Sequence, residues 1–407
     1  MKIIRGGIAT KIIIFTASYG GGHNSVAKAL AEYLKSHYPK TNVEVIDFMK
    51  RFVAGDRIMR TLYKQSAKRL PAAYGIFFHL TDKLFDKPIW KKILTPSLNK
   101  VRVFLTEAKP DIVVSVYPTA GLVCSLLSKE LGFRTATVIT DFGAHSQWIQ
   151  PLTDLYFVPT DDLKKFLVSR GIKPKRIKVT GIPLRKEFSI AHRTTSCPVR
   201  SEHNLPTESV GMNEPNYSLL DASNGLRSPA KIATAIRRRF NLSNKFTVLL
   251  MSGEYGIGNI KELCKRLIRL PIQLIVVCGN NKRLYRKVSE FRNKNLLCLG
   301  FTDQVHNLMA ISDVLIGKAG GITVSEAMAM GLPLIIYRPI PGQEFFNVDY
   351  LVNEGAALYA HHKDDVINRV GFIYEHPHRL KEMKQKAYEI GRPNATKKIC
   401  HWLCSRR

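Results

Sequence analysis

The glycine pair Gly320-Gly321 and the polar residues around it could together bind an anion. An apolar run ends just before the pair. Thr323, with Glu326 three residues later, has the capping-box pattern of a helix start, with Thr323 as the N-cap. A strand, a glycine turn and a helix start leave backbone N–H groups free for a phosphate, and Lys318 adds a cation. The alternative is an ordinary turn in which Glu326 only caps the helix.

A second polar cluster follows the next apolar run, Leu334 to Tyr337. It contains Gln343, Glu344 and Asn347. The carboxyl ends of successive parallel strands meet at one edge of a sheet, and open α/β sheets bind their ligands at such an edge. The two clusters therefore predict a single ligand site.

His23 closes a first glycine loop, Tyr19 to Ser25, in which it follows Gly21 and Gly22. An imidazole can take up a proton near neutral pH, so His23 is a candidate general base. The alternative is a polar residue at a helix start with no chemical role. The chain has neither an Asp-x-Asp pair for a metal-bound diphosphate nor a P-loop motif. We therefore expect no metal, and we expect backbone N–H groups, a helix N-terminus and Lys318 to bind diphosphate charge.

Apolar runs and helical patterns alternate along the chain, which predicts an α/β protein with doubly wound parallel sheets. The strand, glycine turn and helix of residues 11–38 are repeated from Phe246 onward. We therefore predict two Rossmann-like domains that face each other across a cleft. After the strand at 334–337 we expect only a polar helical tail. The predicted segments are an N-terminal domain at 1–189, a linker or insertion at 190–240, a C-terminal domain at 241–390 and a C-terminal helix at 391–407.

The composition indicates a globular and strongly basic protein. Its 407 residues exceed what one core usually holds, and 62 Lys and Arg against 32 Asp and Glu give a net charge of +30. Such an excess favours an anionic partner: a nucleic acid, an anionic membrane surface or a phosphate-bearing substrate. Neither a signal peptide nor a spanning segment is legible, which predicts a chain that is cytosolic or peripherally attached to a membrane. Seven scattered cysteines without a Cys-x-x-Cys pair argue against disulfides and zinc.

The segment from Lys50 to Lys109 mixes basic residues with aromatic and bulky apolar ones. This composition is typical of helices that lie on an anionic membrane surface. Two ordinary amphipathic helices with solvated Lys and Arg faces would have the same composition. Residues 190–235 lack sustained periodicity, which predicts a linker or a poorly ordered insertion.

Taken together, the motifs resemble one family, the monogalactosyldiacylglycerol synthases and processive diacylglycerol glucosyltransferases. These are GT-B glycosyltransferases of family 28, related to the enzyme that adds N-acetylglucosamine to lipid I of peptidoglycan. The residues that carry the resemblance are Ser18–His23, Thr140–Gly143 with Trp148, Asp154–Thr160, Gly181–Arg185, Ser252–Gly258, Lys318–Ala327, and Pro341–Glu344 with Asn347.

The resemblance implies an inverting, metal-independent transfer of a hexose from UDP-glucose or UDP-galactose to diacylglycerol. The product would be a glycolipid, and no cofactor would be needed. His23 would be the general base, and Asp141 would support it. Gly21, Gly22 and Trp148 would lie on the acceptor side. The N-terminal domain would attach peripherally to anionic lipids of the cytoplasmic membrane through the Lys50–Lys109 segment.

The resemblance also implies a UDP-sugar site in the C-terminal domain. The uracil would lie beside Asn280 and Phe301, and Glu326 would bind the ribose. Gln343 and Glu344 would hold the sugar hydroxyls, with Asn347 as a further donor-binding residue. The diphosphate would lie against Gly253, Gly256, Gly258, Lys318, Gly320, Gly321 and Thr323.

The chain departs from the family pattern at Ser252, in the 190–235 insertion and at Phe345-Phe346, which leaves the sugar preference open. One alternative keeps the fold and transfers N-acetylglucosamine from its UDP form to a polyprenyl-linked sugar. Another alternative is a basic nucleic-acid-binding protein. We expect no nucleic-acid partner, because the chain has no recognisable RNA or DNA module. Neither the number of sugars added nor the oligomeric state is predicted.

Overall fold

The computed structural model describes residues 10–19, 21–58, 61, 89–150, 152–189, 229–251 and 260–405. Three predicted features lie wholly or largely outside these residues. They are the second glycine loop with Gly253, Gly256 and Gly258, most of the insertion, and the central part of the Lys50–Lys109 segment.

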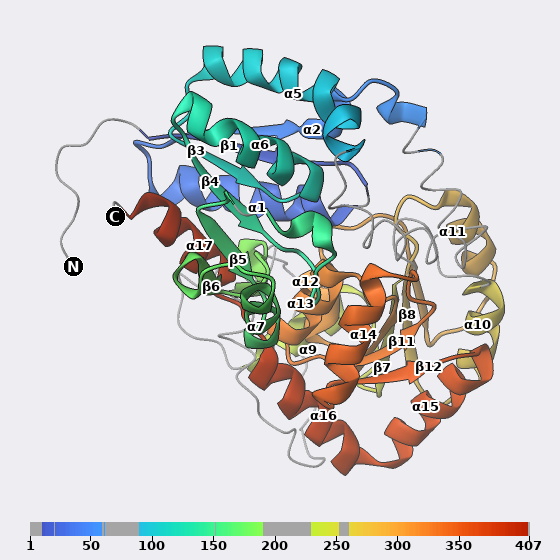
Figure 1. Ribbon diagram of the computed structural model, residues 1–407. Helices are drawn as coiled ribbons and strands as arrows, with labels where there is room; N and C mark the ends of the chain where they lie inside the picture. Colours follow the sequence, from blue (N-terminus) through green and yellow to red (C-terminus); the bar gives the residue numbers. More distant parts are fainter. Residues whose placement is uncertain are drawn as a thin grey trace.

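The first half of the protein is built on a six-stranded parallel sheet with the order β2-β1-β3-β4-β5-β6 (Figure 1). Its first strand in sequence has Ile12, Ile13 and Ile14 in succession, all fully buried, because helices cover both faces of a doubly wound sheet. The strand order reverses between β1 and β3, which opens a crevice at their carboxyl ends. The strands are β1 (Lys11–Thr16), β2 (Asn42–Asp47), β3 (Ile112–Ser115), β4 (Arg134–Val138), β5 (Leu155–Val158) and β6 (Ile177–Val179).

The helices of this half follow the strands, as the alternating pattern predicts. Pro118 stands in the first turn of α6, where proline costs no hydrogen bond, and Gly132 ends the helix in the left-handed conformation. The helices are α1 (Gly21–His37), α2 (Phe48–Phe52), α5 (Ile89–Ala108), α6 (Pro118–Leu131) and α7 (Asp161–Ser169), with the short turns η1 (Ser146–Trp148) and η2 (Pro174–Arg176).

The second half repeats the design in a six-stranded parallel sheet with the order β12-β11-β10-β7-β8-β9. Here the order reverses between β7 and β10, so the loop after β10 opens at the crevice. The strands are β7 (Thr247–Met251), β8 (Gln273–Val277), β9 (Leu296–Leu299), β10 (Val314–Gly317), β11 (Leu334–Tyr337) and β12 (Ala357–Ala360). The helices are α9 (Pro229–Arg239), α10 (Ile260–Leu267), α11 (Lys282–Ser289), α12 (Val305–Ala310), α13 (Gly321–Ala329), α14 (Gln343–Asn353), α15 (Lys363–Glu375) and α16 (Pro377–Ile390).

The prediction of two doubly wound parallel sheets is confirmed, and two local expectations are wrong. The expected helical tail after Tyr337 contains the edge strand β12, which is only four residues long and too short to show a period. The segment predicted as a linker contains α9. Polar, basic and small residues surround the few large apolar residues that pack against the second half, so these do not stand out in the sequence.

The last helix, α17 (Ala395–Cys404), packs against the first half although it follows the second half in sequence. Figure 1 shows it as the red helix beside the blue α1. Ile399 and Leu403 share a core cluster with Val26 and Leu30 of α1, and the Cys400 thiol lies 3.7 Å from the Leu30 carbonyl oxygen. The end of the chain therefore ties the two halves together, and the segment boundaries given above stay a prediction.

Candidate active site

Helix α13 begins at Gly321, three residues before the start that an N-cap at Thr323 predicts. Val324 N donates to Gly320 O over 3.0 Å, so helical bonding starts there and Gly320 is the N-cap, with no side-chain cap. The prediction of Thr323 as N-cap is therefore wrong. Glu326 does not cap the helix either, because its carboxylate faces Arg185. The early start leaves the first N–H groups of α13 without intrahelical acceptors, as an anion site needs.

Gly321 also lets the two halves approach each other. A Cβ at this position would lie 2.0 Å from the backbone oxygen of Thr140, in the loop after β4. A Cβ at Gly22 would lie 3.1 Å from the side chain of Ile322. The first turns of α1 and α13 therefore meet across the junction between the halves.

His23 stands in the first turn of α1, with its ring edge-on to Tyr117 at 5.4 Å between centroids and 6.5 Å from Trp148. Its Nδ1 lies 3.4 Å from the hydroxyl of Thr140. His23 is partly exposed, but the surrounding protein removes most of the hydration of its ring. Burial thus lowers the pKa of His23 from 6.5 to about 4, against a hydrogen bond to the Val116 backbone that raises it. The imidazole is neutral at pH 7 and can accept a proton.

Thr140 is the residue that sequence reasoning missed. Its hydroxyl faces His23, and its carbonyl faces Gly321, so one residue touches both predicted parts of the site. Thr140 belongs to the Thr140–Gly143 motif, which could have pointed to it, but only Asp141 of this motif is predicted as a site residue. The structure gives Asp141 a different neighbour from the predicted one, because its carboxylate accepts from Asn347 over 3.0 Å.

Burial raises the pKa of Asp141 from 3.8 to about 6. The hydrogen bond from Asn347 lowers this pKa, the nearby Glu344 raises it and Lys318 lowers it. Asp141 is therefore a carboxylate at pH 7, held in place by an amide from the other half.

Lys318 lies beside the glycine turn, as predicted. Its Nζ bonds to Glu344 Oε1 over 2.6 Å, and the other oxygen of Glu344 accepts from Ile340 N over 2.8 Å. Glu344 is 2% exposed, and Gln343 before it begins α14 with part of its surface accessible. The glycine turn thus has the cation of Lys318 beside it, paired with the buried carboxylate of Glu344. Glu344 belongs to the second polar cluster, so the two clusters meet as predicted.

Glu326 is buried and pairs with Arg185 over 3.5 Å. Burial raises the pKa of Glu326 from 4.5 to about 7, and the charge and hydrogen bond of Arg185 act in the opposite direction. Arg185 belongs to a motif of the first half but was not predicted as a site residue. Its guanidinium therefore joins the first half to α13.

Asn280 and Phe301 are exposed at the carboxyl ends of the neighbouring strands β8 and β9. Phe301 is 75% exposed, which is unusual for an aromatic side chain and leaves its face free to stack on a flat ring. The two predicted uracil neighbours are therefore brought to one sheet edge.

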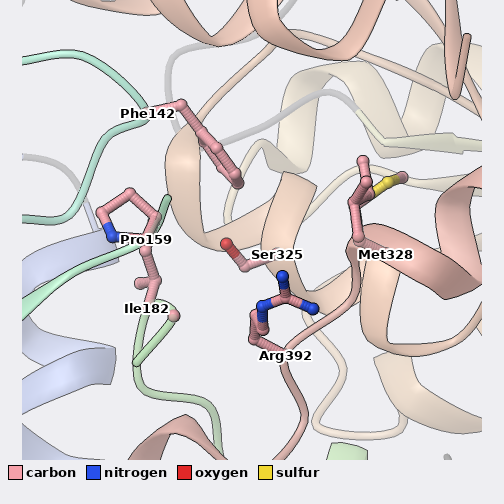
Figure 2. Close-up of a pocket in the computed structure, with 8 residues that line it drawn as sticks. Phe142, Pro159, Ile182, Ser325, Met328 and Arg392 are labelled. Atoms are coloured by element: carbon pink, nitrogen blue, oxygen red, sulfur yellow. The ribbon is translucent and has the colours of Figure 1, made fainter. Parts of the chain in front are cut away.

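Behind α13, side chains from both halves line a small pocket (Figure 2). Phe142, Pro159 and Ile182 come from the first half, and Ser325 and Met328 come from α13.

Within the described ranges, no group of three or more His, Cys, Asp or Glu side chains could hold a metal ion. Within the same ranges, no helix is both long and apolar enough to cross a membrane.

Both halves match known family models. Residues 23–184 match the model of monogalactosyldiacylglycerol (MGDG) synthase, and residues 258–399 match the C-terminal domain of glycosyltransferase family 28. The chain is 30% identical over 383 residues to a processive diacylglycerol beta-glucosyltransferase of Bacillus pumilus (strain SAFR-032), a match that covers 92% of this chain and 89% of the relative. It is 29% identical to the Bacillus subtilis (strain 168) enzyme of the same name, with 96% and 93% covered.

Solved structures share the fold. UDP-GlcNAc 2-epimerase from Neisseria meningitidis, bound to UDP-GlcNAc, has a TM-score of 0.58 at 16% identity, with 97% of this chain and 99% of that chain covered. MurG from Acinetobacter baumannii has a TM-score of 0.54 at 14% identity, with 97% and 98% covered. At these identities the likeness shows the two-domain GT-B fold.

Proposed function

Because the chain belongs to the family of the monogalactosyldiacylglycerol synthases and processive diacylglycerol glucosyltransferases, we propose that it moves a hexose from UDP-glucose or UDP-galactose to diacylglycerol. Its relatives are named for glucosyl transfer to diacylglycerol. The observation that carries the proposal is the meeting of His23 and the start of α13 through Thr140. This contact brings a neutral imidazole to a helix N-terminus suited to a diphosphate.

In the proposed reaction, His23 accepts the proton of the acceptor hydroxyl while that oxygen attacks C1 of the hexose. The bond between C1 and the diphosphate oxygen breaks, and its electron pair leaves with UDP. Attack from the side opposite the diphosphate inverts the configuration at C1. The protonated imidazole then passes its proton to water. Asp141, a carboxylate of the same half that follows Thr140, stabilises the positive charge that builds up on the imidazole.

The departing diphosphate gains negative charge, which must be met for the bond to break. We propose that the free N–H groups of the first turn of α13 meet it, together with Lys318, without a metal ion. Lys318 would then share its charge between the phosphate and Glu344. Gly253, Gly256 and Gly258 are proposed to complete this diphosphate site.

The positions of several side chains support the remaining donor contacts that we propose. Asn280 and the exposed ring of Phe301 are proposed to hold the uracil, and Glu326 the ribose hydroxyls. Gln343 and Glu344, at the start of α14, are proposed to bind the hydroxyls of the hexose. Gly21, Gly22 and Trp148, on the His23 side, would then contact the acceptor.

A water-insoluble acceptor requires the enzyme to work at a membrane surface. The net charge of +30 favours attachment to a surface of anionic lipids. We propose that the protein attaches peripherally to the cytoplasmic membrane. The names of the relatives favour diacylglycerol over a polyprenyl-linked acceptor.

The test is incubation with radiolabelled UDP-glucose, or in parallel UDP-galactose, and liposomes that contain diacylglycerol and an anionic lipid. We expect labelled glycolipid with at least one donor, and separation of the products by chain length gives the number of sugars. Liposomes without diacylglycerol are the control. The absence of glycolipid with both donors would contradict the proposal.

A further inference from the structure

One face of α14 packs against the loop after β4 of the other half. We define this interdomain clasp as Asp141, Phe142 and Gly143 on the loop side, and Phe346, Asn347 and Tyr350 on the helix side. Each loop residue meets a helix residue, and the three helix residues span about one turn of α14.

Asn347 makes the polar part of the clasp. Its Oδ1 accepts from Phe142 N over 2.7 Å, and its Nδ2 donates to Asp141 Oδ1 over 3.0 Å and to Ala319 O over 2.7 Å. Phe142 N–H can only donate and Ala319 O can only accept, so these two backbone groups fix the orientation of the amide. Both donors of Asn347 are used, and the residue is 0% exposed. In this closed arrangement it cannot reach a sugar hydroxyl.

The apolar part of the clasp requires Gly143. A Cβ at this position would lie 2.4 Å from Cγ and 2.6 Å from Cβ of Phe346, so only glycine lets the Phe346 side chain lie against the loop. Phe142 stacks on Tyr350 with 4.7 Å between ring centroids. These contacts fit the helix closely to a loop some two hundred residues away in sequence.

The clasp joins the two sides of the proposed reaction. Its loop side continues into Thr140, whose hydroxyl faces His23. Its helix, α14, begins with Gln343 and Glu344, and Glu344 bonds to Lys318. Ala319, bonded to Asn347, lies in the glycine turn itself. A shift of Asn347 would therefore move Asp141 relative to the diphosphate site.

We propose that Asn347 is a positioning residue that closes the cleft and orients Asp141, rather than a ligand of the donor sugar. This inference rests on the proposed function and replaces the predicted donor-binding role of Asn347. The clasp forms when the halves close, so it contributes to turnover more than to the first binding of UDP-sugar.

The charged groups that face Asp141 are Lys318 and Glu344 from the second half, and His23 lies beyond Thr140 on its own side. Asn347→Asp keeps the acceptor for Phe142 N–H but replaces both donated bonds by contacts between oxygens. The added negative charge disfavours the carboxylate form of Asp141. Activity should therefore be lost at a higher pH than in the wild type as the pH falls.

Two measurements test the inference. The first is hydrogen–deuterium exchange of the peptide that covers residues 139–143, which needs no activity. We expect faster exchange in Asn347→Asp and Asn347→Ala, and wild-type exchange in Asp349→Ala, which changes an exposed residue of the same helix. Unchanged exchange in both Asn347 variants would overturn the inference. This result does not depend on whether the proposed glycosyltransferase activity is found.

The second measurement is kcat and KM for the UDP-sugar as a function of pH. We expect Asn347→Asp to lower kcat by about 10- to 100-fold, to change KM by less than about threefold and to move the acid limb upward. A raised KM with unchanged kcat would assign Asn347 to the sugar and overturn the inference. If the Asn347 variants do not fold, Gly143→Ala disrupts the clasp from the loop side and should show the same kcat loss, whereas wild-type kcat would contradict it.

Discussion

At the scale of single residues, burial decides the charge of the site. It lowers the pKa of His23 to about 4, and it raises the pKa of Asp141 to about 6 and of Glu326 to about 7. In each case loss of hydration is the largest cause, and a neighbour moves the pKa partly back. At pH 7 the imidazole of His23 is therefore neutral, which suits a base that must accept a proton, and Asp141 is a carboxylate.

His23→Ala should remove the base without removing the donor site. We expect kcat to fall by about 10²- to 10⁴-fold, the usual contribution of a general base, while the Kd of UDP changes by less than about twofold. Initial rates and calorimetric titration with UDP measure the two effects. His37→Ala, at the exposed end of the same helix, is the matched control. Equal losses in turnover and UDP affinity would count against a base role.

Glu326→Gln should change how stability depends on pH. The pKa of Glu326 is higher in the folded protein (about 7) than its ordinary value of 4.5. The folded state therefore binds more protons than the unfolded state between these values, and stability falls as the pH rises through this window. At 1.36 kcal/mol per unit of pKa, the fall amounts to about 3 kcal/mol.

The glutamine variant has no such titration, so its stability should decrease less between about pH 5 and pH 7 than that of the wild type. Urea unfolding at several pH values measures the difference. Parallel pH profiles of wild type and variant would show that Glu326 does not titrate in this range.

At the scale of elements, the strands were predictable and the helix starts were not. Buried parallel strands appear as apolar runs such as Ile12 to Ile14, and the alternation of such runs with helical patterns predicts both sheets. The start of α13 was misplaced because Thr323 and Glu326 imitate a local cap. What determines it is Gly321 against Thr140, a contact between distant parts of the chain that no local pattern contains.

The site residues also divide into those that local motifs predict and those that depend on contacts between the halves. The motifs named His23, Lys318 and the glycine turn, which the structure brings to one junction. They did not reveal Thr140 as the contact between them, or that Arg185 pairs with Glu326, because both facts depend on how the halves dock.

Gly321→Ala should hold the two halves apart. The added Cβ would meet a backbone oxygen at 2.0 Å, and a backbone atom cannot turn aside as a side chain can. We expect at least about a tenfold loss of kcat, because the first turn of α13 can no longer reach the His23 side. Gly371→Ala, in α15, meets nothing within 4 Å and should instead stabilise the protein by up to about 1 kcal/mol. Wild-type kcat in Gly321→Ala would show that the closed contact is dispensable.

At the scale of the whole molecule, three of the connections described above hold the halves against each other. They are the interdomain clasp, the pair of Arg185 with Glu326, and α17, which returns to pack on α1. Each uses side chains far apart in sequence. The proposed site depends on all three, because the acceptor side and the donor side belong to different halves.

A crystal structure of the protein with UDP tests the central claim most directly. We predict the diphosphate at the first turn of α13 beside Lys318, the uracil between Asn280 and Phe301, and the ring of His23 facing the open side of the terminal phosphate. UDP bound away from α13, or with His23 turned from the phosphate while the halves are closed, would contradict the account.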